Sequence, residues 1–169
     1  QRQMCIRDRP GSVLIDWVKA SGGKTYSIGK IGDIFSMRNI DYNFTGTDRD
    51  LMDHLRKQID SAEDGSLIFA NFVEFDSLFG HRRDPTGYAK ALEWFDNEIA
   101  SVVRNLLEDD LLIITADHGN DPTWSGTDHT REQVPILIKG KADLIQSVIE
   151  FGDVAKLASK HLGLAIPEP

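Results

Sequence analysis

Two aspartate–histidine pairs lie close together in the stretch TADHGNDPTWSGTDHT, residues 115–130. They are Asp117–His118 and Asp128–His129, and the glycines and proline between them disfavour a continuous helix. A similar combination, Asp76 followed by His81, comes earlier in the chain. Carboxylate oxygen and imidazole nitrogen together suit Mn²⁺, Zn²⁺ or iron better than Ca²⁺, which prefers oxygen alone. These residue types therefore predict a site for a divalent metal.

The predicted strands explain how such distant residues could meet. SLIFANFVEF (66–75) predicts a buried strand ending at Asp76, LLIIT (111–115) a second, and VPILIKG (134–140) a third. Strands that alternate with helices pair in parallel, and ligands bind beyond the carboxyl ends of parallel strands. We therefore expect the following side chains to converge at one edge of the sheet: Asp76, His81, Asp117, His118 and His129.

Helical patterns alternate with these strands. They cover residues 12–23, 47–65, 84–107 and 151–163. Thr47 is expected to cap the second, and Asp84 with Pro85 at the first helical position the third. The buried faces are predicted to carry Leu51, Met52, Leu55 and Ile59 in the second helix, and Tyr88, Leu92, Phe95, Ile99, Val102 and Leu106 in the third.

The predicted fold class is α/β, a layered sheet with mostly parallel strands and helices on both faces. TYSIGKIGDIF (25–35) predicts a short strand that runs into a glycine-rich loop. Residues 38–47 are polar without a period and predict a loop.

Composition excludes several classes of protein. The chain is 40% apolar and 27% charged, as in ordinary soluble domains, and its net charge of −8 argues against nucleic-acid binding. No apolar run approaches the roughly 18 residues that a membrane span needs. Cys5 is the only cysteine, which excludes an internal disulfide and fits a reducing compartment such as the cytoplasm.

The first nine residues, QRQMCIRDR, resemble the translation of an adapter used in sequencing libraries. We therefore predict that residues 1–9 are an adapter-derived tail and that residues 10–169 form the protein. A disordered natural tail is the alternative interpretation.

A simpler interpretation of the histidines stays open. A loop histidine is usually solvated, and an aspartate beside glycine can bond to backbone amides in a turn. His54, within a predicted helix, and His161, near a helix end, are expected to be structural or solvated. His81, His118 and His129 are harder to explain in this way, because each lies within five residues of an aspartate and close to a predicted strand.

Three stretches carry a resemblance to a known family: NFVEFDSLFGHRRDPTGYAKAL, TADHGNDPTWSGTDHTREQVPIL and GKIGDIF. They resemble signature blocks of the phosphopentomutases, which belong to the alkaline phosphatase superfamily. The resemblance covers essentially Pro10 to Pro169. Ser125 stands where the family often has proline and Glu74 where it often has aspartate, and neither is a proposed ligand.

The resemblance implies two Mn²⁺ ions, although the donor types suit Zn²⁺ equally well. By matching motifs, Asp76, His81 and His129 would hold one ion, and Asp117 with His118 the other. A further aspartate ligand and the nucleophilic threonine are expected upstream of this stretch. The chain would then be the C-terminal part of the catalytic core, roughly the last two-fifths of the enzyme, and inactive alone.

The implied reaction moves phosphate between the 1 and 5 positions of ribose or 2-deoxyribose through a phosphoenzyme, with a sugar bisphosphate as activator. The expected partner is thus a small pentose phosphate, with neither nucleic acid nor membrane. Lys30 could meet a substrate phosphate as a point charge, or be a solvated surface lysine. Arg82 or Arg83 could anchor a phosphate or a ligand carboxylate, or pair with Asp84.

Two other classes of function stay open. The first is another enzyme of the superfamily, such as a cofactor-independent phosphoglycerate mutase, a phosphatase or a phosphodiesterase. The second is a metal-binding domain without catalytic activity.

Overall fold

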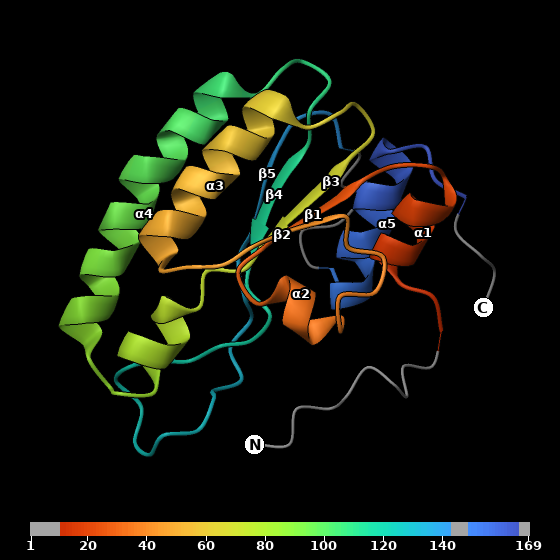
Figure 1. Cartoon of the computed structure of the whole chain (residues 1–169). Helices are drawn as coiled ribbons and strands as arrows, with labels where there is room; N and C mark the ends of the chain where they lie inside the picture. Colours follow the sequence, from red (N-terminus) through yellow and green to blue (C-terminus); the bar gives the residue numbers. More distant parts are fainter. Residues whose placement is uncertain (1–10, 143–148, 166–169) are drawn as a thin grey trace. The chain divides into compact units, whose positions relative to one another are not determined.

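A computed structural model describes residues 11–142 and 149–165, which form two compact units (Figure 1). The first unit contains the described residues up to Asn71 and from Ala142 onward, and the second contains residues 72–141. The predicted adapter-derived tail, residues 1–9, lies outside the described residues. Every candidate metal ligand falls within the second unit.

The first unit is built on a parallel three-stranded sheet in the order β2-β1-β3. Its strands are β1 (Thr25–Ile28), β2 (Tyr42–Phe44) and β3 (Leu67–Ala70). All residues of the central strand β1 are buried, as expected of a strand that is covered on both faces. The predicted α/β class is confirmed.

Helices cover both faces of this sheet. Figure 1 shows α3 (Asp48–Ser61) on one side, and α1 (Leu14–Ala20) with α5 (Phe151–His161) on the other. A short helix, α2 (Ile31–Ile34), follows β1 inside the predicted glycine-rich loop.

The N-terminus of α3 confirms the sequence prediction. Thr47 Oγ1 accepts the N–H of Asp50, whose carboxylate accepts the N–H of Thr47. The face that packs on the sheet buries Leu51, Met52 and Leu55. His54 lies on this helix with its ring 4.9 Å from that of Phe44, in keeping with a structural role.

The second unit carries one long helix and a strand pair. Its elements are a π-helix η2 (Phe75–Gly80), α4 (Pro85–Asn105), β4 (Leu112–Thr115) and β5 (Ile136–Lys139). The predicted cap of α4 is confirmed, because the side chain of Asp84 accepts the N–H of Gly87 at 2.9 Å. Strands β4 and β5 pair antiparallel, since a loop without a crossover helix joins them.

The predicted buried face of α4 is only partly buried. Ile99 and Val102 are buried, whereas Leu92 is 50% exposed. Phe95 meets the rings of Phe72 and Phe75 edge-on, so an aromatic cluster anchors the segment before η2 to this helix.

Two sequence predictions about strands are wrong. The strand expected to run through Phe75 ends at Ala70 and is followed by the π-helix, because a continuous apolar run does not distinguish a strand from other buried structure. The loop expected at residues 38–47 contains β2, whose side chains are largely exposed, so no apolar run indicates it. No helix within the described ranges has the length and apolarity that crossing a bilayer requires.

Asp41 links α1 to the start of β1 and provides a test of the first unit. Its carboxylate accepts hydrogen bonds from Lys19 Nζ and, at 3.0 Å, from the N–H of Thr25. The bond from Lys19, and then that from Thr25, lowers the pKa of Asp41 below 3.8. Because the pKa is lower in the folded state, this stabilisation is complete above the unfolded value and is lost as pH falls through the folded one.

We therefore expect Asp41→Asn to lower the free energy of unfolding by about 1–2 kcal/mol at neutral pH. Urea unfolding of both proteins at successively more acidic pH should show the difference shrinking to zero. Asp53→Asn is the control, because Asp53 is 68% exposed and pairs with Arg56 across one helical turn. A difference for Asp41→Asn that does not change with pH would contradict the assignment.

Candidate metal centre

The winding of η2 brings Asp76 and His81 together. The N–H of His81 bonds to the carbonyl of Asp76 at 2.9 Å, the five-residue spacing of a π-helix turn. In an α-helix, side chains five positions apart point roughly 140° apart around the axis. The wider turn reduces this angle, and Asp76 Oδ2 lies 3.3 Å from His81 Nε2.

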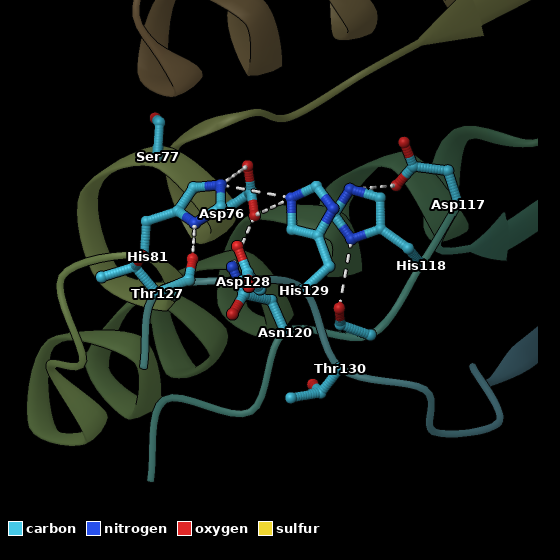
Figure 2. A network of polar contacts seen from close by, with 12 residues as sticks. Asp76, Ser77, His81, Asp117, His118, Asn120, Thr127, Asp128, His129 and Thr130 are labelled. Carbon is cyan, nitrogen blue, oxygen red and sulfur yellow. Dashed lines mark hydrogen bonds and ion pairs between the residues drawn. The ribbon is translucent and has the colours of Figure 1, made fainter. Parts of the chain in front are cut away.

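His129 completes a group of three possible ligands with Asp76 and His81 (Figure 2). One donor atom from each residue lies within 4.8 Å of the others. His129 Nε2 is 3.4 Å from Asp76 Oδ1 and 3.2 Å from His81 Nε2. The structure thus brings together residues that are far apart in the sequence, as the sequence analysis expects.

Hydrogen bonding fixes the tautomer of His81. Its Nδ1 lies 2.6 Å from the carbonyl oxygen of Thr127, which can only accept, so Nδ1 carries the proton. In the neutral ring, Nε2 then presents a lone pair to Asp76 and His129. Lone pairs that face one another in this way are stabilised by a shared cation, and a backbone carbonyl on the far ring nitrogen is the usual support of a metal-binding histidine. The donor set therefore fits a divalent metal.

His118, next to this group, also has one ring nitrogen near a backbone carbonyl and the other near a carboxylate. Its Nδ1 lies 3.2 Å from the carbonyl oxygen of Gly119, and its Nε2 lies 3.7 Å from Asp117 Oδ1. The ring of His118 stacks on that of His129 with centroids 3.7 Å apart (Figure 2). Asp117 is the outermost candidate, with its side chain 76% exposed. All five predicted ligands thus belong to one network.

The loop between Gly119 and Thr130 returns His129 to this network. The two residues form an isolated antiparallel bridge, and Thr130 Oγ1 also accepts the N–H of Asp121 at 2.7 Å. A Cβ at Gly119 would lie 2.0 Å from Glu132 Oε2 and 3.0 Å from the carbonyl oxygen of Thr130, so a side chain here would force the Glu132 carboxylate to move and would crowd the bridge. Within the loop, hydrogen bonds from the hydroxyl and then the N–H of Thr123 lower the pKa of Asp121.

Tyr88 is on α4, and its ring lies 5.8 Å from that of Phe75 in η2. Burial, and then the negative charge of Asp76, raise the pKa of its phenol.

The sequence analysis did not identify Asn120. Its Nδ2 donates to Asp76 Oδ1 at 2.6 Å, and the residue is only 9% exposed. It follows Gly119 in a polar loop, where an asparagine is common, so its type and spacing do not mark it. Arg83 contacts Asn120 and loop carbonyls, whereas Arg82 is exposed.

Lys30 belongs to the first unit, whereas every candidate metal ligand belongs to the second. It is the residue before α2 and is exposed. The preceding Gly29 has φ +85°, a backbone conformation that favours glycine.

Comparison with known proteins agrees with this chemistry. The sequence profile of the metalloenzyme superfamily matches residues 16–166, nearly the whole chain. The chain belongs to the metalloenzyme superfamily. The matched range includes every residue of the candidate ligand network.

Several relatives of the chain carry the name phosphopentomutase. The chain is 43% identical over 164 residues to the phosphopentomutase of Chromohalobacter salexigens, covering 92% of the chain and 39% of the relative. It is 45% identical over 159 residues to that of a Shewanella species, with the same coverage. It is 41% identical over 169 residues to that of Actinobacillus succinogenes, covering 98% of the chain and 43% of the relative. The chain thus spans about two-fifths of the length of these relatives.

Proposed function

We propose that this chain is the C-terminal part of the catalytic core of a phosphopentomutase. Such an isomerase interconverts the 1-phosphate and 5-phosphate of ribose or 2-deoxyribose. Support comes from the relatives that carry this name and from the ligand network in residues 72–141. Because the chain matches only 39% of the length of the first relative, we assign the activity to a longer protein and expect the 169 residues alone to be inactive.

The ligands divide into two sets in this proposal. Asp76, His81 and His129 hold one divalent cation, and Asp117 with His118 contribute to a second. Mn²⁺ is the expected ion, and Zn²⁺ is chemically compatible with the same donors. The nucleophilic threonine and one further aspartate ligand would come from residues outside this stretch.

When bound, two divalent cations would neutralise the charge that develops on the phosphoryl oxygens during transfer. The residues of this chain supply orientation. The two oxygens of Asp76 face different imidazoles, and the carbonyl of Thr127 holds the ring of His81 with Nε2 towards the site. Lys30 would bind the phosphate of the sugar as a point charge.

The remaining partners follow from this chemistry. The substrate is a small pentose phosphate, and a sugar bisphosphate would act as activator by restoring the phosphoenzyme. The proposal includes a cytoplasmic location with neither nucleic acid nor membrane as partner, and the net charge of −8 disfavours nucleic-acid binding.

The observation that carries the proposal is the convergence of Asp76, His81 and His129 within 4.8 Å. The test is to express the longer protein and to measure conversion of ribose 1-phosphate to ribose 5-phosphate with Mn²⁺, together with the metal content. We expect turnover and two ions per chain, with no turnover by the 169 residues alone. Turnover of phosphoglycerate instead of pentose phosphates would assign the protein to another branch of the superfamily.

A further inference from the structure

Arg83 and Asn120 form a hydrogen-bonded chain that ends on a candidate metal ligand. Arg83 Nη1 donates to Asn120 Oδ1 at 2.6 Å, and Asn120 Nδ2 donates to Asp76 Oδ1 at 2.6 Å. A guanidinium can only donate, so the amide oxygen must face Arg83 and the amide nitrogen must face Asp76. Arg83 therefore sets the direction of the amide, and the amide holds one oxygen of the ligand.

The same guanidinium holds the loop that carries His129. Nε donates to the carbonyl of Gly126, Nη1 to those of Gly80 (3.1 Å) and Asp121 (2.8 Å), and Nη2 to that of Asp128 (2.7 Å). Arg83 thus ties the end of η2 to several points along this loop. Because Nε and both Nη atoms face protein oxygens, its role is structural support of the site and not capture of a phosphate.

The backbone at this position adds an independent observation. Arg83 has φ +54°, a conformation that costs free energy for any residue with a Cβ. Such a conformation persists where the surrounding contacts hold it. The adjoining turn is equally constrained, because a Cβ at Gly80 would lie 2.5 Å from Asn120 Nδ2 and would displace the amide.

We propose that Arg83 and Asn120 are positioning residues for the cation held by Asp76, His81 and His129. This inference rests on the proposed metal site. Asp76 Oδ2 faces His81 at 3.3 Å, while Oδ1 lies 3.4 Å from His129 Nε2 and accepts from Asn120. The amide therefore holds the carboxylate with one oxygen towards each imidazole. Arg83 acts through Asn120 and through the loop, not through contact with the ion.

The direction in which metal affinity changes when Arg83 is replaced distinguishes a positioning role from a purely electrostatic one. A guanidinium near a cation repels it, so removal of the charge alone would tighten metal binding. A positioning role predicts weaker binding, because the carboxylate and His129 lose their fixed directions. Arg82→Ala is the matched control, since it removes the same charge from the adjacent exposed residue.

The experiment measures Mn²⁺ binding to the longer protein by calorimetry, with Asn120→Ala, Arg83→Ala, Arg83→Lys and Arg82→Ala variants. We expect Asn120→Ala and Arg83→Ala to weaken one Mn²⁺ site by about 10–100-fold, the range for partners of metal ligands. Arg83→Lys should weaken it similarly, because lysine keeps the charge but not the planar fork. Arg82→Ala should not weaken it.

The visible spectrum of the Co²⁺-loaded protein provides a second readout, because it reports ligand geometry at the ion. It should change in Asn120→Ala and stay unchanged in Arg82→Ala. Asn120→Ala also keeps the loop contacts of Arg83, so it decides the outcome if the Arg83 variants do not fold. Unchanged affinity and spectrum in Asn120→Ala would overturn the inference while leaving the metal site intact. Absence of Mn²⁺ binding by the unmodified protein would overturn both.

Discussion

Asp76→Ala in the longer protein should lower phosphopentomutase turnover by about 10³-fold or more and remove one of two bound Mn²⁺ ions. Asp76 provides the carboxylate between two imidazoles, with 3.3 Å to His81 Nε2 and 3.4 Å to His129 Nε2. Loss of a catalytic cation removes several kcal/mol of transition-state stabilisation, which corresponds to a change in rate of this size. Steady-state kinetics and metal analysis of the purified variant check the two parts of the prediction.

Two controls and a companion variant sharpen this test. His129→Ala should reproduce the loss of one ion, because His129 belongs to the same ligand set. Asp96→Ala, which removes an exposed carboxylate from α4, should leave turnover and metal content unchanged. His161→Ala, at the end of α5, should do the same. Equal loss of both ions in Asp76→Ala would show that the division of ligands between two sites is wrong.

Gly29→Ala should destabilise the first unit by about 3–4 kcal/mol, since it combines two costs that are each known. Gly29 has φ +85°, and a Cβ there would lie 2.3 Å from the carbonyl oxygen of Asn71. That carbonyl belongs to the backbone directly after β3, where the N–H of Asn71 bonds to the carbonyl of Ile28, so it cannot move without disturbing the sheet. Urea unfolding measures the loss of stability.

Gly22→Ala isolates one of these costs. Gly22 has φ +86°, but a Cβ there would meet no atom within 4 Å. We expect a loss of about 1–2 kcal/mol, the cost of the left-handed conformation alone. The difference between the two variants measures the steric conflict with Asn71, and equal losses would show that this conflict is relieved by local movement.

Helix starts were predictable from the sequence because capping is a local interaction. Thr47 with Asp50, and Asp84 with Pro85, act within one turn of chain, so the pattern of residues contains the whole interaction. The buried face of α3 followed from periodicity for the same reason. The exposure of Leu92 on α4 was not predictable, because burial depends on which neighbours a helix acquires.

The predicted strand beyond Ala70 failed for a different physical reason. Apolar residues continue through Phe75. The rings of Phe72 and Phe75 pack against Phe95 on α4, and neither residue belongs to a strand. Apolar character predicts that these side chains pack, but not the backbone conformation that packs them. The π-helix turn that follows depends on the contacts of its surroundings more than on local propensity.

The convergence of the candidate ligands was predictable from the sequence, but the groups that hydrogen-bond to them were not. Carboxylate and imidazole types near strand ends indicate metal chemistry, and the resemblance to a family indicated the division into two sets. Asn120 and the carbonyl of Thr127 are common groups in polar loops, and their importance comes only from where the loop places them. The sequence left open whether Arg83 anchors a phosphate or a ligand carboxylate, or pairs with Asp84. Its hydrogen bonds to the loop carbonyls of Asp121 and Asp128 are visible only in the structure.

The candidate ligands of this chain all lie within residues 72–141, and this location has a consequence for turnover. The three donors proposed for the first ion, Asp76, His81 and His129, lie in one compact unit, so a hinge movement outside that unit need not stretch a bond to that ion. We expect ion retention and substrate exchange to be kinetically separate, with many sugars processed for each ion released. Isotope exchange of bound metal should then be far slower than catalysis and insensitive to the concentration of substrate.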